Sequence, residues 1–169
     1  QGGLFSINHP VLDLGDVCIG CAWVNELPAR VDGVEVATGG YDEVGFLFNT
    51  AARDFWDHLL DEGSHAAPVG GSDDHRAGVD EGAFGSSIGS PTTMIFASEL
   101  SAAALAQGLR DNRVVVKLQG PQDAMIDFQT FPERVRDTVF PGDDLVLRAT
   151  ITGGVGLHAR FLQHGFPLE

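Results

Sequence analysis

The stretch Ala66-Ala67-Pro68-Val69-Gly70-Gly71-Ser72-Asp73-Asp74-His75 joins a short apolar run to a glycine-rich turn and then to charged residues. The apolar part, residues 66–69, predicts a short buried strand. Asp73 and His75 are two positions apart, so in an extended segment both side chains leave the same face. Polar side chains just past a buried strand are typical of the active sites of α/β proteins.

The pair formed by Asp73 and His75 has two interpretations. A carboxylate oxygen and an imidazole nitrogen are suitable ligands for Zn²⁺, Mn²⁺ or Fe. The same residues are also compatible with a surface Asx-turn that carries a solvated histidine. The spacing alone does not decide between a ligand pair and a turn, so the decision depends on the rest of the chain.

The first 120 or so residues alternate expected strands with expected helices. Apolar residues recur every three or four positions from Phe46 to Leu60, which predicts a helix with Gly63 just past its end. Ser98 is the expected N-cap of a second helix over residues 100–111. Strands are expected over residues 4–7, 31–36, 67–71, 92–97 and 114–118. This alternation predicts an α/β domain with a largely parallel sheet and crossover helices.

The pattern changes after Gly120. Residues 144–151 and 156–162 alternate apolar and polar side chains, and a glycine-rich turn separates them. We therefore predict that these two segments form an antiparallel hairpin. The chain is expected to divide into an α/β domain over residues 1–122 and a small antiparallel β appendage over residues 123–169. We expect both ends to be cuts through a longer protein.

The chain is strongly acidic, with 24 acidic and 10 basic residues and a formal net charge of -14. This balance argues against nucleic acid and against anionic membrane surfaces as partners, because both require clustered Lys and Arg. No apolar run approaches the roughly 18 residues of a membrane span. Acidic surfaces are compatible with an extracellular or periplasmic location. A cytoplasmic location is the alternative, and the charge is equally compatible with compensation by a more basic N-terminal half.

Cys18 and Cys21 are the two cysteines of the chain and form a Cys-x-x-Cys pair. A four-cysteine zinc site is excluded, because there is no second pair. A small disulfide-closed loop in an exported protein is the favoured interpretation. The alternative is two inert thiols.

Several short motifs occur in the order found in PHP (polymerase and histidinol phosphatase) domains. They are Asn8-His9-Pro10, Val34-Glu35-Val36, Leu59-Leu60-Asp61-Glu62-Gly63, Gly71-Ser72-Asp73-Asp74-His75 and Gly89-Ser90-Pro91-Thr92-Thr93. Over residues 4–122 the chain resembles the C-terminal half of such a domain, most closely the CehA/McbA-like metallohydrolase branch. The resemblance implies a partial, distorted (β/α)7 TIM-like barrel with two or three divalent metal ions (Zn, Mn or Fe) at the strand ends.

The resemblance also implies roles for individual residues. His9, Asp73 and His75 match the metal ligands of the Asn-His-Pro and Gly-Ser-Asp-x-His motifs. Glu35 matches a strand glutamate beside the catalytic site, although an ordinary strand carboxylate is the alternative. Independently of the resemblance, the guanidinium group of Arg76 is expected to make a bidentate contact to a substrate phosphate or carboxylate, with a loop ion pair as the alternative.

The chain lacks the ligands that PHP domains carry in their N-terminal half, including a His-x-His pair. Three ligands hold one metal ion with an open position, whereas a two-metal site needs more. We therefore expect the N-terminal half of the same protein, in this or a separate chain, to complete the site. The expected function is a metal-dependent hydrolase, in which metal-activated water attacks a phosphate ester of a small molecule, glycan or lipid. The alternative is a non-catalytic barrel fragment or β module with a binding or structural role.

Overall fold

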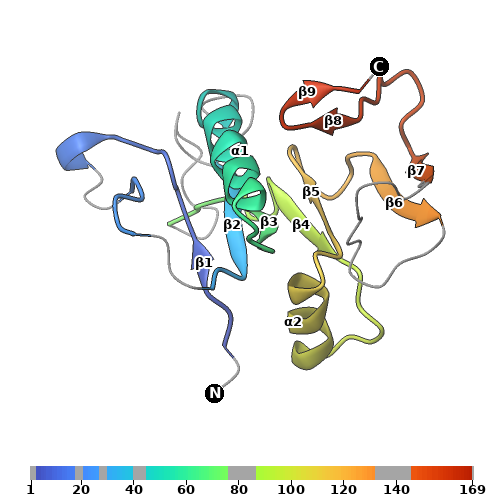
Figure 1. Cartoon of the computed structure of the whole chain (residues 1–169), viewed down its shortest axis with the longest axis horizontal. Helices are drawn as coiled ribbons and strands as arrows, with labels where there is room; N and C mark the ends of the chain where they lie inside the picture. The colour runs from blue at the N-terminus through green and yellow to red at the C-terminus, as the bar shows by residue number, and fades with distance from the viewer. Residues whose placement is uncertain are drawn as a thin grey trace.

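A parallel three-stranded sheet with the order β1-β2-β3 is the central element of the fold (Figure 1). It consists of β1 (Ser6–Ile7), β2 (Gly33–Thr38) and β3 (Ala67–Gly71). The loop after β1 contains the short 3-10 helix η1 (Gly15–Val17). The computed structural model describes residues 3–17, 21–26, 30–39, 45–75, 87–131 and 146–168.

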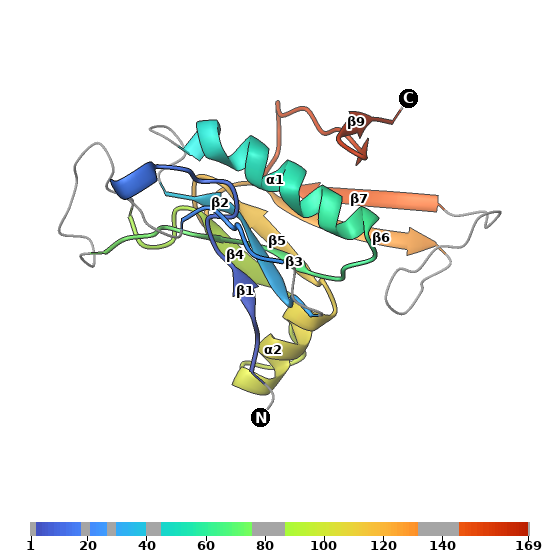
Figure 2. The ribbon, with the colours of Figure 1, turned by 60° about the vertical axis from the view of Figure 1, so that its left-hand side comes forward.

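Helix α1 (Phe46–Asp61) connects β2 to β3 and packs against the sheet (Figure 2). Its apolar stripe delivers Leu59 into a core, where burial of one such side chain contributes roughly 1.5–3 kcal/mol. The indole nitrogen of Trp56 donates a hydrogen bond to the Ala66 carbonyl at 2.8 Å, which ties the helix to the start of β3. The predicted helix is confirmed, and Gly63 follows it with a φ of +88°. The buried members of this core are Ile7, Val31, Val34, Leu59 and Ala66.

Strands β4 (Thr92–Ile95) and β5 (Val114–Lys117) pair antiparallel, and α2 (Ala102–Arg110) connects them. The N-cap of α2 is Ser101, whose hydroxyl oxygen accepts a hydrogen bond from the Ala104 N–H at 3.2 Å. The prediction of Ser98 as N-cap is wrong, because the helix begins three residues further along.

Strand β3 lies against the β4–β5 pair through a side chain rather than a backbone ladder. The Thr93 hydroxyl oxygen accepts a hydrogen bond from the Gly70 N–H at 2.8 Å and lies 2.9 Å from the Gly70 carbonyl oxygen, to which it donates. A Cβ at position 70 would lie only 2.9 Å from Val116 Cγ1. Glycine at position 70 is therefore required by close packing.

The C-terminal part contains two antiparallel pairs: β6 (Met125–Phe131) with β7 (Val146–Thr152), and β8 (Leu162–Gln163) with β9 (Phe166–Pro167). The predicted pairing of residues 144–151 with 156–162 is wrong, because β7 pairs with β6 along seven residue pairs. Alternation identifies a strand but not its partner, and β6 offers a longer ladder than the segment after β7.

The prediction of a partial (β/α)7 barrel is also wrong. The described residues form a mixed α/β structure with two α-helices, separate small sheets and no closed barrel. After α2 the Arg113 N–H bonds to the Gly108 carbonyl, and the Phe96 N–H bonds to the Arg113 carbonyl. These contacts turn the chain back, so β5 runs antiparallel to β4, whereas a TIM-like barrel needs parallel strands.

None of the helices in the part of the chain that the structure describes combines the length and the apolar character needed to cross a bilayer.

Candidate functional site

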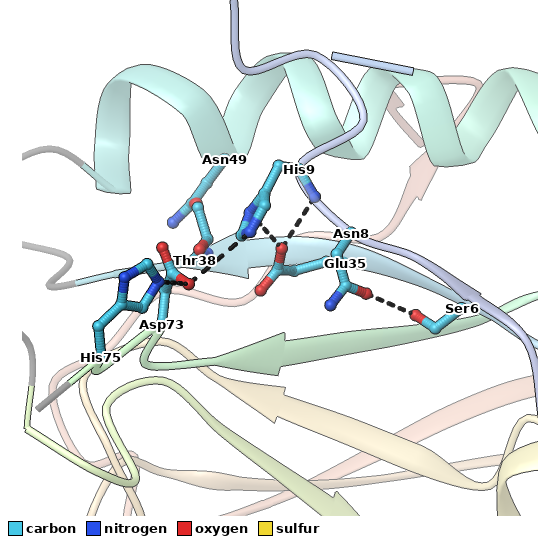
Figure 3. A network of polar contacts seen from close by, with 8 residues as sticks. All are labelled: Ser6, Asn8, His9, Glu35, Thr38, Asn49, Asp73 and His75. Carbon is cyan, nitrogen blue, oxygen red and sulfur yellow. Dashed lines mark hydrogen bonds and ion pairs between the residues drawn. The ribbon is translucent and has the colours of Figure 1, made fainter. Parts of the chain in front are cut away.

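The candidate site lies at the carboxyl ends of the three parallel strands (Figure 3). His9 follows β1, Glu35 belongs to β2, and Asp73 and His75 follow β3. Parallel strands end at the same edge of a sheet, and this edge is where α/β proteins gather functional side chains. The four side chains come from three segments distant in sequence, so the fold brings them together.

Backbone contacts hold the His9 loop in place. His9 has a φ of +49°, a strained conformation for a residue with a side chain. Its N–H donates a hydrogen bond to Glu35 Oε2 at 2.9 Å, and its carbonyl accepts one from the Leu12 N–H at 3.2 Å. The Pro10 carbonyl accepts a further hydrogen bond from the Trp23 N–H at 2.9 Å. These contacts offset the strain and direct the imidazole toward β2.

The His9 ring contacts the Glu35 carboxylate. Nδ1 of His9 lies 2.7 Å from Oε2 of Glu35, whose side chain is only 8% exposed. Nδ1 is buried, and the contact is an ion pair at close range when the ring is protonated. The contact with Glu35 raises the pKa of His9, burial opposes this, and the charges of Glu35 and Asp73 raise the pKa further.

Asp73 lies between two imidazoles. Its Oδ1 is 2.9 Å from Nε2 of His75 and 3.8 Å from Nε2 of His9. Asp73 also has a left-handed backbone, with a φ of +54°. The His75 side chain is 80% exposed. The network therefore runs from the buried Glu35 through His9 and Asp73 to His75 at the surface.

The structure brings together four of the five residues that the sequence singled out: His9, Glu35, Asp73 and His75. Arg76 lies outside the described residues, so its predicted role stays a prediction. Cys21 is buried and disulfide-bonded, whereas Cys18 also lies outside the described residues.

The sequence prediction missed Thr38 and Asn49. The Thr38 N–H donates a hydrogen bond to Asn49 Oδ1 at 3.2 Å, which joins the end of β2 to the first turns of α1. The register between β2 and β3 shifts between Glu35 and Ala37, and Thr38 is paired with Gly71. Thr38 consequently lines a pocket together with Glu35, although simple alternation places residues three apart on opposite faces.

The pocket lies between the His9 loop and α1. Its polar lining comes from His9, Glu35 and Thr38, and its apolar lining includes Leu12, Phe48 and Ala52. The enclosed part is narrow, with space for about one water-sized group. The pocket therefore gives a small group access to the same edge of the sheet as the ion-pair network.

The donor atoms suit a divalent metal ion, but their present arrangement is that of an ion-pair network. Among the described residues, no group of three or more His, Cys, Asp or Glu side chains is placed to hold a metal ion as it stands. Two features still fit a metal site. The carboxylate behind His9 Nδ1 leaves Nε2 as the outward nitrogen, as in many metal-binding histidines. The distance of 3.8 Å from Nε2 to Asp73 exceeds a hydrogen bond but is near the roughly 3.4 Å between two ligands of one tetrahedral ion.

Comparison of the chain with protein-family models, with curated proteins and with solved structures found no match.

Proposed function

We propose that this chain contributes metal ligands to a metal-dependent hydrolase that acts on phosphate esters. The observation that carries the proposal is the meeting of four side chains in one network: His9 after β1, Glu35 within β2, and Asp73 and His75 after β3. Imidazole nitrogens and carboxylate oxygens are the ligand types of Zn²⁺, Mn²⁺ and Fe sites. The order of the motifs along the chain, which resembles PHP domains, supports the same function.

In this proposal His9, Asp73 and His75 hold one divalent ion, with Nε2 as the ligand atom of His9. Glu35 fixes the orientation of His9 through its contacts to the backbone N–H and to Nδ1. A bound divalent ion supplies a Lewis acid and a bound water of lowered pKa. His75 must turn away from its direct contact with Asp73 to become a ligand, and its exposed position leaves room for this movement.

The site is proposed to be completed by further ligands. Three side chains suffice for one ion, whereas a site with two or three ions needs more. We propose that an N-terminal half of the same protein, in this or a separate chain, supplies them. An extracellular or periplasmic location is supported by the disulfide bond of Cys21, because disulfides persist in oxidising compartments.

Metal titration tests the proposal. We expect Zn²⁺ or Mn²⁺ to bind the wild-type protein with a defined stoichiometry in calorimetry, confirmed by elemental analysis. Asp73→Asn should weaken binding at least tenfold, since it removes a charged ligand. Asp54→Asn, the same substitution at an exposed position of α1, should leave binding unchanged. Hydrolysis of chromogenic phosphomonoesters and phosphodiesters should fall in parallel with metal binding. Equal metal affinity of the wild type and Asp73→Asn would refute the proposal.

A non-catalytic module with a binding or structural role is the second candidate. The observation that favours it is the number of large apolar side chains exposed on and around the C-terminal strands. Exposed apolar surface of this kind often marks an interaction site. The most exposed of these are Phe128, Val146, Val155, Leu157 and Phe166. A wild-type protein that binds no stoichiometric metal would favour this second function.

A further inference from the structure

Thr38 carries a buried polar atom that has no partner among the residues the structure describes. Its hydroxyl oxygen is inaccessible to solvent and makes no hydrogen bond to any residue that the structure describes. Most buried hydroxyl groups in proteins are hydrogen-bonded, so each exception calls for an explanation. An unused donor beside a candidate active site is explained most simply by a ligand that accepts its hydrogen bond.

The backbone around Thr38 is held on two sides. Its N–H donates a hydrogen bond to Asn49 on α1, and its strand position is paired with Gly71 on β3. Gly71 lies two residues before Asp73, so Thr38 belongs to the same edge of the sheet as the network (Figure 3). The hydroxyl is therefore placed by regular secondary structure rather than by a flexible loop.

The pocket lined by Thr38 has room for a single oxygen atom, which reaches the enclosed hydroxyl after a small movement of the pocket wall. Thr38 shares this pocket with His9 and Glu35, and its space admits about one water-sized group. Phe48 and Ala52 form part of the apolar wall. A hydrogen bond made against apolar walls is stronger than one made in water, because the surroundings have a low dielectric constant.

We propose that the Thr38 hydroxyl is a substrate-binding group that donates a hydrogen bond to one phosphoryl oxygen of the substrate. The inference rests on the proposed function, since it takes the phosphoryl group to be anchored at His9, Asp73 and His75. Thr38 touches the substrate in this arrangement and Asn49 positions Thr38. The competing explanation is a structural water that occupies the same space without any role in binding.

Binding of inorganic phosphate, the product of the proposed reaction, separates these explanations. Phosphate is titrated by calorimetry into the wild type and into Thr38→Val, Thr38→Ala and Thr38→Ser, each with and without Zn²⁺ or Mn²⁺. Valine keeps the shape of threonine but lacks the donor, and serine keeps the donor. Alanine repeats the loss of the donor if the valine variant does not fold.

Loss of one hydrogen bond to a charged oxygen should weaken phosphate binding about tenfold or more in the valine and alanine variants. The serine variant should bind phosphate within about threefold of the wild type. The affinity for the metal alone should be the same in all four proteins. A phosphate affinity unchanged by Thr38→Val or Thr38→Ala would overturn the inference and leave the proposed function intact.

The two proposals fail separately. A wild-type protein that binds metal but no phosphate overturns the inference alone. A wild-type protein that binds no metal refutes the proposed function. In that case the phosphate titration without metal decides the inference. The inference is overturned if the wild type binds no phosphate, or if Thr38→Val and Thr38→Ala bind phosphate as tightly as the wild type.

Discussion

Replacement of Glu35 should have two separable effects, because its carboxylate makes two different contacts. Oε2 accepts a hydrogen bond from the His9 N–H at 2.9 Å and lies 2.7 Å from the His9 ring nitrogen Nδ1. The first contact anchors the loop after β1, and the second orients the imidazole. Glu35→Ala removes both contacts, whereas Glu35→Gln keeps an oxygen that can accept the backbone hydrogen bond.

The cost to stability follows from these contacts. A hydrogen bond to a charged group contributes about 1.5–3 kcal/mol, and Glu35→Ala also leaves the His9 N–H without a partner, so we expect a loss of about 2–4 kcal/mol. For a chain of this length such a loss lowers Tm by about 4–16 °C. Glu35→Gln should lose only about 1 kcal/mol, since a neutral hydrogen bond replaces the charged one.

Glu35→Gln should change the free energy of metal binding by more than it changes the free energy of unfolding. The carboxylate favours a proton on Nδ1, which leaves Nε2 unprotonated and able to bind a metal ion. In Glu35→Gln the amide oxygen that keeps the backbone hydrogen bond also faces Nδ1, but it carries no charge and therefore holds the Nδ1 proton less firmly. Loss of such a carboxylate partner typically reduces metal affinity 10–100-fold. Urea unfolding of the metal-free protein and calorimetric titration with Zn²⁺ measure the two effects.

Glu62→Ala is the matched control. Glu62 contacts His58 at the exposed end of α1, and surface ion pairs of this kind contribute about 0–1 kcal/mol. The reasoning about Glu35 is refuted if Glu35→Ala and Glu62→Ala lower the free energy of unfolding equally. A metal affinity of Glu35→Gln equal to that of the wild type would refute the orienting role.

Two further predictions follow from the site and from the packing of α2. The pKa of His9 is raised in the folded state, so the pairing of His9 with Glu35 stabilises the metal-free protein. This contribution is fully present below the unfolded pKa of about 6.5. It is lost as the pH rises through the folded pKa. NMR titration of the imidazole should show the raised pKa in the wild type and a smaller shift in Glu35→Gln; an equal pKa in both would contradict the assignment to Glu35. Gly108→Ala should destabilise the protein by about 1–3 kcal/mol in thermal unfolding, because the new Cβ would lie 2.6 Å from Ile95 Cγ2 and 2.7 Å from the Phe96 carbonyl oxygen. The control is Ala103→Gly at an exposed position of the same helix, which measures the effect of glycine on helix propensity alone, about 1 kcal/mol. A Gly108→Ala variant that is more stable than the wild type would show that α2 does not approach β4 this closely.

Local patterns predicted the individual elements well. The apolar spacing from Phe46 onward predicted α1 to within a residue or two, because a helix that packs on a sheet needs an apolar stripe at that spacing. Gly63 also marked the end of α1, because glycine readily takes the left-handed conformation that follows many helices. The N-cap of α2 was misplaced from Ser101 to Ser98, since both serines precede the same apolar run and the sequence does not show which of them caps the helix.

Pairings between distant segments were predicted less well. Alternation marked β7 as a strand, but its partner proved to be β6 rather than the segment that follows it. The alternation of strands and helices predicted a largely parallel sheet, and the resemblance to PHP domains implied a barrel. The antiparallel pairing of β4 with β5 contradicts the barrel. Strand direction and partner depend on hydrogen bonds between distant segments, such as that from the Phe96 N–H to the Arg113 carbonyl, which no local pattern reveals.

The sequence by itself determined which residue types follow the parallel strands: a histidine after β1, a carboxylate within β2, and an aspartate and a histidine after β3. Chemistry and spacing singled out Asp73 and His75, and the resemblance to PHP domains added His9 and Glu35. Only the tertiary structure decided that these side chains meet, that Glu35 is buried behind His9, and that Thr38 joins the same pocket. The physical reason is that parallel pairing brings separate strand ends to one edge, while the register shift in β2 changes which side chains face it.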